Sequence, residues 1–170
     1  KPPKPNKGKG GKEAATGILG ALATGDRFAV VVGIADYPGE DNDLDYTDDD
    51  AQEMYNALTS VYGFEPNDVT LLMDLAATRA AILTAIEDIE TSPVLSSDDE
   101  VVFFFSGHGT KGIADDGDKE RVDEAIAAHD GTDIVPIWDG ELKAAFSEFA
   151  TSRIIFIFDT CLAGGMKKDL

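Results

Sequence analysis

The stretch VVFFFSGHGT, residues 101–110, decides the fold. Its five leading residues are β-branched or aromatic, which predicts a strand over residues 100–105 that is buried on both faces. Ser106 and then His108, which stands between two glycines, follow this strand directly. Glycine ends a strand and allows another group to approach the backbone closely, and open α/β sheets bind their ligands at the carboxyl ends of their strands. We therefore expect His108 to lie at the mouth of a cleft.

Three more apolar runs predict strands, and helical patterns separate them. The strands are expected at residues 27–34, 69–73 and 153–158. Helices are expected from about Thr47, after Thr78 as the capping residue, and over residues 139–149, and a long polar segment spans residues 111–131. The helix after Thr78 should bury the face that carries Ile82, Ala85, Ile86 and Ile89. Alternating strands and helices predict an α/β fold with a parallel, doubly wound sheet and right-handed crossovers.

The charge of the chain is large and unevenly distributed. The 170 residues, enough for one domain with a real core, carry a net charge of −19. Residues 1–12 contain five lysines and no acid, which leaves nine basic and 33 acidic side chains, a net −24, on residues 13–170. We expect residues 1–24 to form a disordered basic tail and residues 25–170 to form the folded domain. That domain should repel nucleic acid and attract basic peptides or divalent cations.

Membrane and compartment signals are weak in this sequence. No apolar run approaches the roughly 20 residues that a membrane span needs, so we expect a soluble chain that makes no membrane contact. The chain does not begin with Met, which leaves a removed signal peptide open. The sequence therefore does not distinguish a cytoplasmic from a secreted protein.

Cys161 is the only cysteine, and it follows the strand at 153–158 as His108 follows the strand at 100–105. Parallel strands all point the same way, so both side chains should lie at one rim of the sheet. A thiolate is a nucleophile in acyl transfer, and an imidazole beside it can accept the thiol proton. The backbone amides of Gly109 and Cys161 could then stabilise an oxyanion. Taken alone, a cysteine at a strand end is more often a small buried residue, and a histidine is more often a surface group. The two residues together favour a catalytic pair.

Four motifs together resemble the caspase-like cysteine peptidases of clan CD, especially the metacaspase and orthocaspase branch. They are SGHG at 106–109, FDTCLAGG at 158–165, LDYTDDDA at 44–51 and TRAAILTAI at 78–86. The resemblance covers residues 27–165. It implies a caspase-like α/β/α sandwich with a mostly parallel central sheet, of which residues 25–170 form the large, p20-like subunit only. It also implies an endopeptidase in which His108 is the general base and Cys161 the nucleophile.

The same resemblance implies a basic specificity. The pocket aspartates of metacaspases fall on Asp50 and Asp159, and two carboxylates suit a substrate Arg or Lys, so cleavage should follow a basic residue. Each aspartate also has a structural reading: Asp50 lies at capping-box spacing from Thr47, and Asp159 could cap the turn after its strand. The chain departs from the family in two places. Leu162, Ala163 and Gly164 follow the nucleophile where metacaspases often have H-S-G, and Thr47 replaces a common pocket cysteine.

An acidic segment, residues 114–130, resembles the part of many metacaspases that binds activating Ca²⁺. The carboxylates expected to bind calcium are Asp116, Asp118, Asp123 and Glu124, since Ca²⁺ prefers oxygen ligands. A solvated acidic loop is the alternative, and the chemistry of the Cys161 and His108 pair itself requires no cofactor.

The expected basic specificity makes Lys167 and Lys168, which closely follow Cys161, candidate sites of processing. Cleavage after either lysine would separate a large from a small, p10-like subunit, as in maturation of this family. The strands of that small subunit would cover the outer edge of the strand at 153–158, which has no follower in this chain. Two surface lysines are the structural alternative.

Three other functions are compatible with parts of this sequence. A catalytically silent caspase-like module could bind calcium or a basic protein through the acidic surface. A clostripain-like Arg-specific peptidase would share the fold plan and the order of histidine and cysteine. A receiver-type phosphoacceptor would explain the acidic residues after the first strand but not the SGHG motif.

Overall fold

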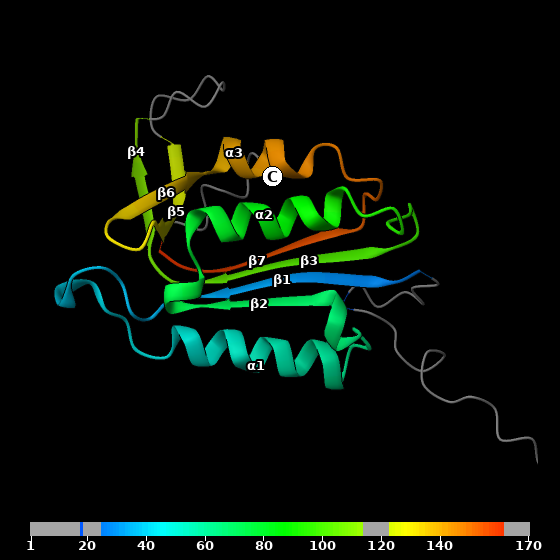
Figure 1. Cartoon of the computed structure of the whole chain (residues 1–170), viewed down its shortest axis with the longest axis horizontal. Coiled ribbons are helices and arrows are strands. Elements are labelled where there is room, and N and C mark those ends of the chain that lie inside the picture. The colour runs from blue at the N-terminus through cyan, green and yellow to red at the C-terminus, as the bar shows by residue number, and fades with distance from the viewer. Residues whose placement is uncertain (1–17, 19–24, 114–122, 162–170) are drawn as a thin grey trace, which may run out of the picture.

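The computed structural model describes residue 18 and residues 25–113 and 123–161. At its centre is a four-stranded parallel sheet in the order β2-β1-β3-β7 (Figure 1). Its strands are β1 Arg27–Gly33, β2 Val69–Met73, β3 Glu100–Ser106 and β7 Ile154–Asp159. The helices are α1 Thr47–Ser60, α2 Arg79–Glu90 and α3 Asp139–Phe146, with short 3-10 helices at Glu40–Asn42, Pro66–Asp68 and Asp74–Ala76. The expected parallel α/β sheet is confirmed.

Helices cover both faces of this sheet. Helix α1 lies on one face, and α2 and α3 lie on the other (Figure 1). Side chains of a strand alternate between faces, so Phe103 and Phe105 of β3 join the core under α2 and α3, while Val102 and Phe104 join the core under α1. Every residue of β1 and β3 is buried. The unbroken apolar run of β3 is therefore explained by two covered faces.

A second, antiparallel sheet was not expected from the sequence. Strands β4 Gly109–Gly112, β5 Asp123–His129 and β6 Ile134–Trp138 form it in the order β4-β5-β6. The prediction of a continuous polar segment over 111–131 was wrong, because β5 is buried almost throughout although it begins and ends with charged or polar residues. The third helix is also shorter than the expected 139–149.

Two helix starts test the capping arguments. Thr78 caps α2 as expected, since its Oγ1 accepts a hydrogen bond from the Ala81 amide at 3.1 Å. The helix also buries the expected Ile82, Ala85, Ile86 and Ile89. The capping-box interpretation of Thr47 is wrong: the N-cap of α1 is Tyr46, and Thr47 Oγ1 instead donates to the Ile34 carbonyl at 2.6 Å. Asp50 is thus free of that capping role.

The strand register brings the carboxyl ends of three strands level. Ser106 of β3 is paired with Gly33 of β1 on one side and with Asp159 of β7 on the other. Within the described part of the chain, β7 pairs with β3 alone, and its residues are only partly buried or exposed. Beta7 is therefore the less protected edge of the sheet.

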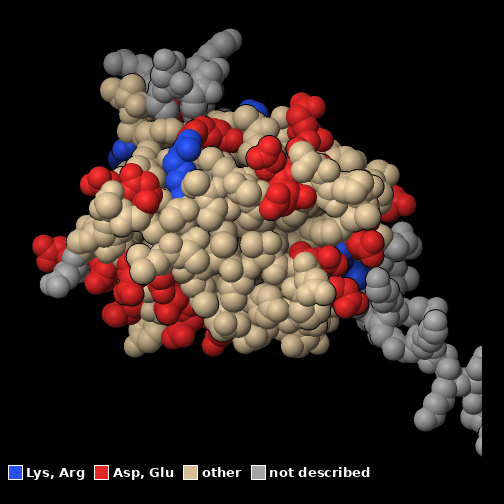
Figure 2. Space-filling view, viewed as in Figure 1, with Lys and Arg blue, Asp and Glu red and all other residues tan. Residues whose placement is uncertain are grey.

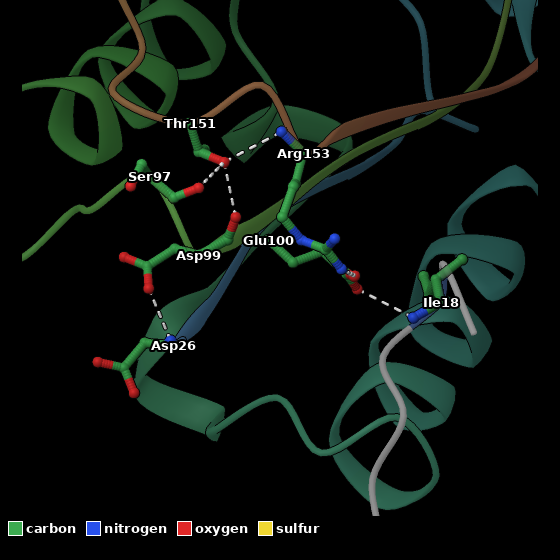
Figure 3. Close-up of polar contacts among 7 residues, drawn as sticks. All are labelled: Ile18, Asp26, Ser97, Asp99, Glu100, Thr151 and Arg153. Atoms are coloured by element: carbon green, nitrogen blue, oxygen red, sulfur yellow. Dashed lines mark hydrogen bonds and ion pairs between the residues drawn. The ribbon is translucent and has the colours of Figure 1, made fainter. Parts of the chain in front are cut away.

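A polar network fixes the opposite, amino-terminal end of the strands (Figure 3). Glu100 has no exposed surface, and it accepts hydrogen bonds from Arg153 Nη2 at 3.3 Å and from the Ile18 amide at 2.9 Å. Beside it, Thr151 Oγ1 donates to the Asp99 carbonyl at 2.7 Å. These contacts join the starts of β3 and β7, so they help to hold the register that aligns the other end. No helix in the described ranges is long and apolar enough to cross a membrane.

Candidate active site

The loops after β3 and β7 meet at the carboxyl rim of the sheet. The Gly107 amide donates to the Asp159 carbonyl at 3.3 Å, directly where the two strands end. A Cβ placed on Gly109 would overlap the carbonyl oxygen of Cys161 and lie 2.6 Å from Thr160 Oγ1. The second glycine of the SGHG motif is thus required by close contact with the cysteine. His108 and Cys161 lie at one rim, and the Cys161 side chain is exposed.

The imidazole of His108 is oriented by a backbone carbonyl. Its Nε2 lies 2.8 Å from the carbonyl oxygen of Asn42. A carbonyl oxygen only accepts hydrogen bonds, so in the neutral ring Nε2 carries the hydrogen and Nδ1 keeps its lone pair. This is the tautomer that can accept a proton at Nδ1.

The loop that supplies Asn42 is itself held by aspartates. Asp74 accepts hydrogen bonds from the amides of Ala35 at 2.8 Å and Asp36 at 3.0 Å, and Asp43 accepts one from the Tyr37 amide at 3.2 Å. Neither Asn42 nor Asp74 was expected from the sequence to take part in the site. A backbone carbonyl leaves no signal in a sequence, because any residue type supplies one.

Asp50 and Asp159 line the same surface pocket, as expected. This open pocket of about 310 Å³ lies at the junction of α1 with the ends of β3 and β7. Its lining residues are Asp50, Glu53, Met54, Ala57, Phe104 and Asp159. Within the described residues none of its three carboxylates forms an ion pair. The pocket therefore offers negative charge beside an apolar wall.

Ser106 is a neighbour of this pocket that sequence reasoning did not assign to it. Its side chain is fully buried, and its Oγ donates to Asp50 Oδ2 at 3.1 Å. The bond leaves the other carboxylate oxygen of Asp50 available to a ligand. The position of Ser106 at the end of a buried strand was visible in the sequence, but its partner was not.

Acidic side chains also surround the rim. Figure 2 shows them gathered over the start of α1 and the loop that precedes it. Asp41, Asp43, Asp45 and Asp49 are all exposed there. This end of the molecule should attract cationic ligands.

The expected calcium ligands do not form a site in the described residues. Asp123 and Glu124 lie on β5 rather than in a loop, and consecutive strand residues point to opposite faces. Asp123 is buried, and Glu124 is paired in register with Lys111. The described ranges contain no group of three or more His, Cys, Asp or Glu side chains that could hold a metal ion. Asp116 and Asp118 lie outside the described residues.

The expected processing residues, Lys167 and Lys168, also lie outside the described residues. Their role therefore stays a prediction from the sequence.

Comparisons with known proteins place these features in a family. The family model described as "Caspase domain" matches residues 26–169. Metacaspase-1 of Saccharomyces cerevisiae is 30% identical over 150 residues, which cover 83% of this chain and 34% of that protein. Metacaspase-4 of Arabidopsis thaliana is 31% identical over 146 residues, covering 81% of this chain and 34% of that protein.

A solved structure has a similar fold. A crystal structure of a Geobacter sulfurreducens protein matches with a TM-score of 0.63 and 26% identity, over 80% of this chain and half of that chain. The chain spans about a third of the length of the curated relatives that it matches.

Proposed function

The chain belongs to the caspase domain family, and from that premise we propose that it is the catalytic part of a cysteine endopeptidase with basic specificity. Two contacts support the proposal: Gly109 packs against the Cys161 carbonyl, and the Asn42 carbonyl binds Nε2 of His108, which leaves Nδ1 to accept a proton. The nucleophile and its base therefore belong to adjoining loops of one rim.

In the proposed reaction His108 Nδ1 accepts the proton of the Cys161 thiol. The sulfur attacks the carbonyl carbon of the scissile peptide bond, and the amide N–H groups of Gly109 and Cys161 stabilise the resulting oxyanion. His108 then returns the proton to the leaving amine, which leaves an acyl group on the sulfur. A water molecule, deprotonated by the same imidazole, hydrolyses this thioester and frees the cysteine.

The pocket beside Asp50 and Asp159 is the proposed site for the residue before the cleaved bond. A guanidinium or ammonium group would form charge-assisted hydrogen bonds with these carboxylates. The apolar wall of Met54, Ala57 and Phe104 suits the aliphatic stem of Arg or Lys. An acidic substrate side chain would instead meet like charge.

A small, p10-like subunit is the proposed partner of this chain. Within the described residues the outer edge of β7, whose sequence IIFIFD is largely apolar, has no partner strand, and a further strand could pair there. Cleavage after Lys167 or Lys168 by the same basic specificity would release that subunit from a precursor. Western blotting of a full-length Cys161→Ala variant tests this, since self-processing predicts that it stays uncleaved.

Calcium activation is a proposal that rests on the acidic sequence around residues 114–124 and the resemblance to metacaspases. Peptidase activity should rise with Ca²⁺, fall with a chelator, and not be restored by Mg²⁺. Equal activity with Ca²⁺, with a chelator and with Mg²⁺ would show that calcium does not activate the protein.

The full-length protein should be assayed on fluorogenic peptides that differ only in ending with Arg, Lys or Asp, with and without Ca²⁺. We expect cleavage after Arg or Lys that is lost in Cys161→Ala and His108→Ala. Folded protein that cleaves none of these peptides would favour a silent module that binds basic partners through its acidic surface.

A further inference from the structure

The first glycine of the SGHG motif faces a side chain that the proposed mechanism does not use. A Cβ on Gly107 would lie 2.6 Å from the phenol oxygen of Tyr37. Tyr37 belongs to the loop after β1, its side chain is buried, and its ring lies 4.8 Å from the His108 ring between centroids. The absence of a side chain at Gly107 thus leaves room for the Tyr37 hydroxyl beside the loop that carries His108.

The phenol takes the place of one hydrogen bond of a β-ladder. Beta4 and β5 are antiparallel, with Gly109 paired to Ile126, so His108 and Ala127 are the next pair in register. Such a pair exchanges two backbone hydrogen bonds when it is of the hydrogen-bonded kind. One is present, from the Ala127 amide to the His108 carbonyl at 2.9 Å.

The second bond of this pair runs through Tyr37. The His108 amide donates to the phenol oxygen at 2.9 Å, and the phenol donates to the Ala127 carbonyl at 2.9 Å. The hydroxyl therefore lies between the His108 amide and β5, whereas the His108 carbonyl bonds to β5 directly. This one-sided separation turns the backbone of His108 away from the ladder. Burial raises the pKa of Tyr37 well above the usual range of a phenol, so the hydroxyl keeps the proton that it donates.

We propose that Tyr37 is a positioning residue for His108: its hydroxyl is a spacer in the β4–β5 ladder that aims the imidazole. The inference rests on the proposed role of His108 as the base. In this arrangement the Tyr37 hydroxyl places His108 so that its Nε2 reaches the Asn42 carbonyl and its Nδ1 is left to accept the proton of the Cys161 thiol.

Removal of the Tyr37 hydroxyl is expected to displace the imidazole of His108. In Tyr37→Phe the His108 amide and the Ala127 carbonyl face each other without the atom that joins them. Because two unpaired polar groups in a buried place are costly, the ladder is expected to close directly, and this closure moves the imidazole. A displacement on the order of 1 Å costs up to about 100-fold in rate.

The test compares Tyr37→Phe with Tyr62→Phe in the full-length protein. Tyr62 is exposed beyond the end of α1, so its variant controls for the loss of a phenol elsewhere. We expect kcat on the best basic peptide to fall about 10- to 100-fold in Tyr37→Phe, with KM within about twofold, and no change in Tyr62→Phe.

A second readout needs no substrate. Iodoacetamide should alkylate Cys161 of Tyr37→Phe more slowly than wild type near pH 7, because a displaced imidazole no longer accepts the thiol proton. It should react at the wild-type rate near pH 10, where hydroxide removes the thiol proton instead. A general structural defect would slow both reactions, or speed both by exposing the thiol. Gly107→Ala, whose methyl group would crowd the phenol oxygen of Tyr37, should give the same pattern and serves if Tyr37→Phe does not fold.

The outcomes separate this inference from the proposed function. Wild-type kcat and alkylation at both pH values in a folded Tyr37→Phe would overturn the positioning role while leaving the peptidase proposal intact. Activity that survives in His108→Ala or Cys161→Ala would overturn the proposed dyad, and the positioning role with it.

Discussion

Gly109 packs so closely against the Cys161 carbonyl that the place of a Cβ is already filled. The contact is between two backbones, so it fixes the nucleophile loop relative to the histidine loop without any side-chain pairing. It also gives a physical reason for glycine after His108 that is independent of family resemblance.

Replacing Gly109 with alanine should displace Cys161. We expect Gly109→Ala to lower kcat at least about 100-fold, because the methyl group pushes away the loop that carries the sulfur. Thr110→Ala, the next residue of β4, is the matched control and should keep its activity. Steady-state kinetics with a melting curve for each variant measures this. A folded Gly109→Ala with wild-type kcat would contradict the role given to the contact.

Asp50 should set the preference for a basic substrate. We expect Asp50→Asn to lower kcat/KM for Arg peptides about 10- to 100-fold, because a hydrogen bond to a charged group is worth about 1.5–3 kcal/mol. Asp49→Asn removes an equal charge from an exposed neighbouring position and should have a much smaller effect. Equal losses in the two variants would instead mean that general surface charge, not the pocket, selects the substrate.

The backbone conformation of Tyr46 is predicted to destabilise the folded protein. Tyr46 is the N-cap of α1 at φ 72°, a left-handed conformation that costs L-residues about 1–2 kcal/mol, and the residue is 71% exposed. Tyr46→Gly should therefore be more stable than Tyr46→Ala, by about 1 kcal/mol, because both remove the ring and only glycine relieves the backbone. Urea denaturation of the two variants decides this, and a more stable alanine variant would refute it.

The network at the amino-terminal end of the strands should be important for stability. Glu100→Gln leaves Arg153 without its buried anionic partner, and we expect a loss of roughly 3 kcal/mol in the free energy of unfolding. Glu87→Gln, at an exposed position of α2, should change stability by less than about 0.5 kcal/mol. Chemical denaturation measures both, and similar values for the two would show that the buried pair contributes nothing.

The sequence predicted the central sheet well because its strands obey one simple rule. Beta1 and β3 are covered on both faces, so nearly every residue is apolar and the runs stand out. Strand ends could also be placed, which brought Cys161 and His108 to one rim. Beta5 escaped prediction because Asp123 and Glu124 at its start and His129 at its end leave only a short, alanine-rich apolar run between them.

The candidate site was predictable only where side chains carry the chemistry. Asp50 and Asp159 were expected in one pocket, and they line one. Asn42 acts through its carbonyl and Tyr37 through a hydroxyl inserted between two backbones, so neither contact has a sequence pattern. The interpretation of Thr47 as a cap failed because the Ile34 carbonyl, distant in sequence, competes for its hydroxyl.

Covalent trapping can show whether Cys161 is the nucleophile of a peptidase with basic specificity. The full-length protein should be treated with two peptidyl ketone reagents of the acyloxymethyl type that differ only in ending with Arg or Asp, and the modified residue located by mass spectrometry. We predict that the Arg reagent labels Cys161, that the Asp reagent does not, and that His108→Ala and Asp50→Asn each slow the labelling. Preferential labelling by the Asp reagent, or no labelling of Cys161 in folded, calcium-loaded protein, would contradict the account.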